Sequence, residues 1–142
     1  MLLIDVNVLV YAYREDSPNH PAFRNWLAGL VQSETPFGVA DLVLSGFLRI
    51  ATHPKIFKPP SPLEDALHFA ETLRAQPGCI VLTPGPRHWE IFTQLCQATR
   101  AMGNLIPDAY LAAMAIEARG TWITTDRDFS HFPGLDWRHP LS

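Results

Sequence analysis

Cysteine and lysine are scarce in this sequence of 142 residues, and each scarcity argues against a class of protein. The two cysteines, Cys79 and Cys96, lack the close spacing of metal ligands and lie in apolar segments, so we expect two buried thiols and no disulfide framework. Lys55 and Lys58 are the only lysines among 11 basic residues, and the formal net charge is -3. Nucleic-acid binding would therefore depend on a local group of arginines, whose planar guanidinium groups suit phosphate.

Long apolar runs are also missing. No run approaches the roughly 18 residues that a membrane span requires, and no charged start precedes an apolar segment of the signal-peptide kind. Hydrophobic residues make up 47% and charged residues 18%, which is enough apolar surface for a core and too little charge for general disorder. We expect one domain over residues 1–142, soluble and cytoplasmic.

Short β-branched or apolar runs alternate with longer segments of helical periodicity. The predicted strands cover residues 2–5, 35–40, 79–83, 121–125 and 135–139. The predicted helices cover residues 7–13, 21–31, 41–52, 62–76, 86–102 and 106–120. We take Asn7 as the N-cap of the first helix and Gly103 as the terminator of the fifth. This order predicts an α/β fold, a three-layer sandwich with a mainly parallel central sheet.

Aspartates stand where sites form in parallel sheets, beyond the carboxyl ends of the strands. Asp5 ends the first strand, Asp126 follows the strand "TWITT" with Asp128 just after, and Asp108 opens the helix "IPDAYLAAMA". Each has a structural explanation as well, because an aspartate can cap a helix or favour its first turn. Taken together they favour a cation-binding site. Two carboxylates about 4 Å apart repel by about 4 kcal/mol at an effective dielectric constant of 20, so such a cluster needs compensation. A cation would offset that repulsion, and oxygen ligands without histidine or cysteine favour Mg²⁺ or Mn²⁺.

Four segments in order resemble the PIN-domain nucleases, and more narrowly the VapC-type toxins of bacterial type II toxin–antitoxin modules: "LLIDVNVLVYAY", "GFLRIATHPKIF", "IPDAYLAAMAIEARG" and "WITTDRDFSHFPGLDW". The resemblance runs nearly end to end and implies a PIN-like sandwich. It also implies an endoribonuclease that depends on Mg²⁺ or Mn²⁺ and cleaves RNA phosphodiesters with activated water. A homodimer and inhibition by a cognate VapB-type antitoxin are further implications.

By position, Asp5, Asp108 and Asp126 match the acids of the family's site, and Asp128 matches a further acid before Phe129. We expect the first three to be catalytic and all four to be metal ligands. Candidate substrate contacts are Asn7, Arg49 and Arg127.

One position departs from the family pattern. Many members carry a glutamate in the third helix, where this chain has Gly46 in "LVLSGFLRI". Asp41 could take its place only if the start of that helix lies near the edge of the sheet. The alternative to an enzyme is therefore a catalytically impaired PIN-like module that binds RNA or protein without a complete metal site.

The large aromatic and apolar side chains lead to two further expectations. Trp26, Phe47, Trp89 and Trp122 are expected in the core and not as platforms for base stacking. The stripe of Phe23, Trp26, Leu27 and Leu30 could pack inside the protein or receive part of an antitoxin.

Overall fold

The computed structural model describes all 142 residues and contains a five-stranded sheet in which every neighbouring pair of strands is parallel. The strands lie in the order β3-β2-β1-β4-β5. Their bounds are β1 (Leu2–Ile4), β2 (Phe37–Ala40), β3 (Cys79–Leu82), β4 (Thr121–Ile123) and β5 (Trp137–Arg138). The predicted α/β sandwich is confirmed, and the sheet is parallel throughout instead of mainly so.

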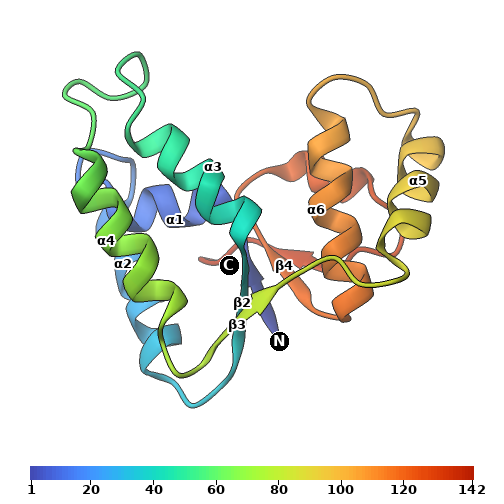
Figure 1. Ribbon diagram of the computed structural model, residues 1–142, viewed down its shortest axis with the longest axis horizontal. Helices are drawn as coiled ribbons and strands as arrows, with labels where there is room; N and C mark the ends of the chain where they lie inside the picture. The colour runs from blue at the N-terminus through green and yellow to red at the C-terminus, as the bar shows by residue number, and fades with distance from the viewer.

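Six α-helices and one 3₁₀ helix connect the strands. Their bounds are α1 (Val6–Tyr13), α2 (His20–Gln32), α3 (Asp41–Ala51), α4 (Leu63–Arg74), α5 (His88–Thr99), α6 (Leu105–Ala118) and η1 (Arg127–His131). Helices α1 to α4 lie on one side of the sheet, and α5 and α6 lie on the other (Figure 1). Helices on both faces are the usual solution for a parallel sheet, because its connections must cross over the faces.

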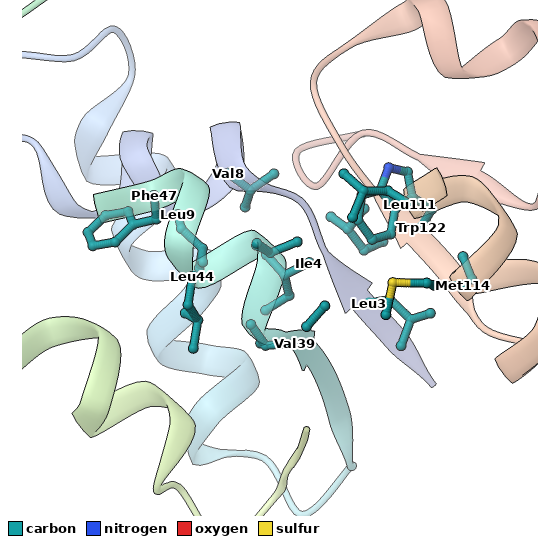
Figure 2. Packing of buried hydrophobic residues seen from close by; sticks show 14 of the residues in the cluster. Leu3, Ile4, Val8, Leu9, Val39, Leu44, Phe47, Leu111, Met114 and Trp122 are labelled. Carbon is teal, nitrogen blue, oxygen red and sulfur yellow. The ribbon is translucent and has the colours of Figure 1, made fainter. Parts of the chain in front are cut away.

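Strand β1 lies at the centre of the sheet and is apolar on both faces. Leu3 and Ile4 are fully buried, and they point to opposite sides of the sheet as successive strand residues do. Figure 2 shows Leu3 beside Met114 of α6, whereas Ile4 lies near Leu44 of α3. A core cluster of 30 buried residues, which includes Leu3 and Ile4, thus lies around the strand that precedes Asp5.

Two predicted helix boundaries are wrong. The N-cap of α1 is Asp5 and not Asn7, because the carboxylate Oδ1 of Asp5 accepts the Val6 backbone N–H at 2.7 Å. Both residue types are good caps, so propensity alone could not separate them. Helix α5 ends at Thr99, where Arg100 adopts the left-handed conformation with φ 50°, and Gly103 lies in the loop beyond. A non-glycine residue performs the termination that was assigned to the glycine.

Some predicted core residues are not buried. Phe47 and Trp122 are buried and Trp26 is half-buried, but Trp89 in the first turn of α5 is 69% exposed. Cys79 and Cys96 are free thiols as expected, yet both are half-buried. Strand β3 explains Cys79, since it lies at an edge of the sheet and even its central Ile80 is 45% exposed. None of the helices has the length and apolar content that crossing a membrane requires.

A close approach of the chain at Gly120 gives a test of this packing. Gly120 precedes β4, and a Cβ atom there would lie 2.9 Å from the backbone oxygen of Met1 and 2.8 Å from Leu3. We expect Gly120→Ala to lower the free energy of unfolding by about 1–3 kcal/mol, as overpacking does. The control is Gly29→Ala, at an exposed site of α2 with no atom within 4 Å, which should raise stability by about 0.5–1 kcal/mol. Urea denaturation measures both, and equal effects of the two substitutions would contradict the packing described.

Candidate functional site

The carboxyl end of the sheet brings polar side chains from three parts of the chain together. Strand β1 ends just before Asp5, and β4 ends just before Thr124, which lies 119 positions later. Because β1 and β4 are parallel and in register, with Ile4 opposite Ile123, the residues that follow them meet at one edge. Helix α6 adds Asp108 from its first turn.

Asp5 is held by three hydrogen-bond donors. Its side chain is almost completely buried, with 4% of its surface exposed. Oδ1 accepts the Val6 backbone N–H, and Oδ2 accepts the Thr124 hydroxyl at 2.7 Å and the Asn7 side-chain amide at 3.1 Å. Burial raises the pKa of Asp5, and the nearby charge of Asp126 raises it further, although these hydrogen bonds act in the opposite direction. The carboxylate is fixed in position, and holding it charged is costly.

Thr124 connects two of the acids and was missed in the sequence. Its fully buried side chain donates to Asp5 and accepts the Asp126 backbone N–H at 3.0 Å. The Asn7 amide also donates to Thr124 Oγ1, and the Asn7 carbonyl accepts the Thr125 N–H at 3.1 Å. A hydroxyl at the end of a buried strand, two residues before an aspartate, was the available signal. Asn7 is therefore a residue that positions the acids, and its predicted contact with substrate stays a prediction.

Asp108 lies within electrostatic reach of the other acids. Partial burial, followed by the charges of Asp126, Asp5 and Asp128, raises its pKa to about 6. The protein has only two ion pairs, Arg14 with Asp16 and Arg74 with Asp41, so no basic side chain is paired with this group. We call Asp5, Asp108, Asp126 and Asp128 the acid group. The structure brings the four predicted acids together, and their roles as ligands or catalysts stay predictions.

Asp126 and Asp128 also have the structural role that was considered for them. Asp126 Oδ1 accepts the Asp128 backbone N–H at 2.9 Å and caps η1. Asp126 is half-buried, whereas Asp128 is exposed. One oxygen of Asp126 is thus used in the cap, and the other has no partner within the protein.

The third helix adds no carboxylate to the acid group. Asp41 follows β2 and so does start near the sheet edge, but its carboxylate accepts two hydrogen bonds from Arg74, at 2.8 and 3.2 Å, and does not perturb Asp108. A Cβ atom at Gly46 would lie 3.0 Å from Val6, the residue after Asp5. The helix therefore passes next to the acid group at the position where the family resemblance places a glutamate, and this chain has only a hydrogen atom there.

The two predicted arginine contacts differ in their surroundings. Arg127 follows Asp126 directly and lines a cavity together with Thr125. Arg49 is exposed in the last turn of α3 and has no ion pair. The structure provides no link between Arg49 and the acid group.

The donors of the acid group suit a hard divalent cation. They are carboxylate oxygens, and burial together with the charges of Asp126, Asp5 and Asp128 raises the pKa of Asp108. No three acidic, histidine or cysteine side chains are close enough to hold an ion directly in this arrangement. Mg²⁺ usually keeps several water ligands and takes only one or two carboxylates from the protein.

Comparison with known proteins agrees with this geometry. The family model described as PIN domain matches residues 2–135. VapC ribonuclease Mb2897 of Mycobacterium bovis is 45% identical over 141 residues, which cover 99% of this chain and 96% of that protein. Ribonuclease VapC25 of Mycobacterium tuberculosis is 46% identical over 135 residues, or 95% of each chain.

Solved structures show the same fold at much lower identity. VapBC-1 from nontypeable Haemophilus influenzae contains a chain with a TM-score of 0.72 and 15% identity, and the match covers 99% of this chain and 98% of that one. VapBC2 from Rickettsia felis, bound to a DNA fragment from its promoter, contains one with a TM-score of 0.71 and 16% identity, covering 97% of both chains. Sequence and fold together place the chain in the PIN-domain family, among its VapC-type members.

Proposed function

We propose that the protein is the toxin of a type II toxin–antitoxin pair, an endoribonuclease that requires Mg²⁺ or Mn²⁺. The observation that carries the proposal is the acid group, in which partial burial and the charges of three other carboxylates together raise the pKa of Asp108. Relatives that are 45–46% identical over nearly the whole chain bear the name ribonuclease. A homodimer is expected from the same resemblance.

The side chains divide the work of phosphodiester hydrolysis. When bound, the metal ion would orient water, lower its pKa and offset the negative charge that develops on the phosphate. Asp5, Asp108, Asp126 and Asp128 would hold the ion, partly through its water ligands. Thr124 and Asn7 keep the Asp5 carboxylate from rotating, so the charge stays at a fixed place as the reaction proceeds.

A groove between α2 and α4 supports the proposal of an antitoxin partner. It encloses about 640 Å³ and is mainly apolar, with Tyr13, Leu27, Val31, Phe69 and Leu73 among its lining. Of the predicted stripe, Phe23 and Leu27 are buried and Trp26 and Leu30 are half-buried, and only Leu27 lines the groove. We infer that a VapB-type antitoxin places an apolar segment in the groove and a basic segment against the acid group, where its arginine or lysine would replace the cation.

Asp5→Asn tests whether the acid group is catalytic. Asparagine also caps helices, so we expect the fold to remain while cleavage of a labelled RNA in Mg²⁺ falls by about 10²-fold or more, as when a key electrostatic group is lost. The matched control is Asp41→Asn, since Asp41 is bound to Arg74 outside the group, and it should cleave at the parental rate. Parental cleavage by Asp5→Asn, or no cleavage by the unaltered protein in Mg²⁺ or Mn²⁺, would favour the RNA- or protein-binding module instead.

Asp108 should make metal binding depend on pH. Because its pKa is about 6, it is mostly protonated at pH 5, and we expect Mg²⁺ affinity there to be about tenfold weaker than at pH 7. The effect on stability has the opposite sign to that of a paired acid. The folded protein binds this proton more tightly than the unfolded chain, so the contribution of Asp108 becomes unfavourable as pH rises from 3.8 through about 6.

Asp108→Asn should therefore raise the unfolding temperature in EDTA above pH 7 and have little effect near pH 4. Added Mg²⁺ should reduce this gain, because only the parent protein has the complete acid group. Thermal unfolding at the two pH values measures the difference, and a variant that is less stable than the parent at neutral pH in EDTA would argue against the repulsion.

Blocking the groove should weaken the antitoxin without affecting cleavage. Ala28 is an exposed residue of α2 that lines the groove, and Ala28→Arg would fill it from the rim. We expect a loss of at least tenfold in affinity for the cognate antitoxin, measured by titration calorimetry, and unchanged RNA cleavage. Ala22→Arg, at an exposed site of α2 outside the groove, is the control.

The basic segment is tested separately. Asp5→Asn, Asp108→Asn and millimolar Mg²⁺ should each weaken the antitoxin, because each removes or occupies the negative charge that the segment binds. Affinity that none of these changes alters would show that the antitoxin acts at another surface.

A further inference from the structure

A polar cavity lies beyond the end of β4, and Thr125 and Arg127, the two sequence neighbours of Asp126, line it. It has a volume of about 790 Å³ and is formed by three segments: the residue before α2, the chain from Thr125 into η1, and the chain from β5 to Ser142. The side chains that matter here are Asn19, Thr125, Arg127, Trp137, Arg138 and His139. We call it the arginine cavity.

The arginine cavity is fixed relative to the acid group by the sheet. Arg138 lies opposite Ile123 in the β4–β5 pairing, and its carbonyl accepts the Thr124 N–H at 3.1 Å. Thr124 is the residue whose hydroxyl binds Asp5. Thr125, which lines the cavity, donates its N–H to Asn7, another partner of Asp5. The arginine cavity and the acid group are thus connected through Thr124 and Thr125, at the end of β4.

The charged side chains that line the arginine cavity are both arginines. Arg127 and Arg138 both line it, neither takes part in an ion pair, and no aspartate or glutamate side chain lines it. Two arginines that line one hollow without an ion-pair partner favour an anion with several oxygens, because a guanidinium group can bind such an anion through two N–H groups. Trp137 is half-buried in the wall and supplies an aromatic surface beside them.

We propose that the arginine cavity holds the RNA strand next to the bond that is cut, with Arg127 and Arg138 on a backbone phosphate and Trp137 against a base. The inference rests on the proposed ribonuclease function, to which it adds a binding site for the substrate. A strand that places one phosphate at the acid group must continue to one side of it, and this cavity is the adjoining hollow with positive charge. Arginine with an aromatic side chain is the combination that binds single-stranded nucleic acid by charge and stacking.

The same charge argues against the antitoxin as the occupant. The segment that would neutralise the acid group is basic, and Arg127 and Arg138 would repel its continuation. The mainly apolar groove between α2 and α4 is lined by one arginine, Arg24, and one acid, Asp65, so it offers that partner a surface without an excess of positive charge.

Binding of RNA in EDTA tests the inference without any cleavage. The probe is a fluorescently labelled single-stranded RNA of mixed sequence, and its anisotropy is measured against the full-length protein at several salt concentrations. Arg127→Gln and Arg138→Gln should each lower the affinity about tenfold. Each should also reduce the slope of log K against log salt by about 0.7, the value for one phosphate contact on a single strand.

Two further variants separate charge from structure. Arg138→Lys keeps the charge, so it should retain the salt slope while losing part of the affinity, which a merely structural role of Arg138 would not produce. The control is Arg87→Gln, at an exposed arginine that lines neither the arginine cavity nor the groove, and it should bind RNA as the parent does. Thermal unfolding confirms that each variant is folded.

The outcomes distinguish this inference from the proposed function. Cleavage by the parent in Mg²⁺, together with unchanged RNA binding by Arg127→Gln and Arg138→Gln, would overturn the inference alone. Weaker binding of the antitoxin with unchanged binding of RNA would assign the cavity to the protein partner and would also overturn it. If the parent neither cleaves nor binds RNA, both proposals fail. Loss of RNA affinity in the two variants, with the control unaffected, supports the cavity as a substrate site.

Discussion

The burial of one carboxylate governs this structure. A neutral residue could cap α1 as well as Asp5 does, without the cost of removing a charge from water. The protein meets that cost with a hydroxyl, an amide and a backbone N–H, and the hydroxyl is available only because β4 lies next to β1. The central strand pair, the α1 cap and the acid group are therefore one arrangement, and none of them can change without affecting the others.

Electrostatics divides the surface around this arrangement into regions of different character. Carboxylates without basic partners lie at the carboxyl edge of the sheet. Two unpaired arginines line the cavity beyond the end of β4, and an apolar groove lies between α2 and α4. The Thr124 N–H donates to the Arg138 carbonyl and the Thr125 N–H donates to Asn7, and neither Arg127 nor Arg138 is paired with an acid.

Sequence reasoning reached the layers of the fold and the members of the acid group, because strand runs and the aspartates that end them are local signals. It failed where several residues could do the same job. Asp5 and Asn7 are both good caps, and Arg100 takes the left-handed turn that Gly103 would also allow. The exposure of Trp89 depends on which face of α5 meets α6, and Thr124 gains its role only from a strand pairing that spans most of the chain. Such facts belong to tertiary structure and cannot be read from neighbours in the sequence.

The separation of Asp5 and Thr124 in the sequence also determines when their hydrogen bond can form during translation. Asp5 is synthesised before its partner Thr124, which follows 119 positions later. At about 5–20 residues per second, roughly 6–24 seconds of translation lie between them. During that time β1 has no β4 to pair with, so neither the Asp5–Thr124 bond nor the complete acid group exists on the growing chain. The acid group can therefore be completed only after β4 has been synthesised and has paired with β1.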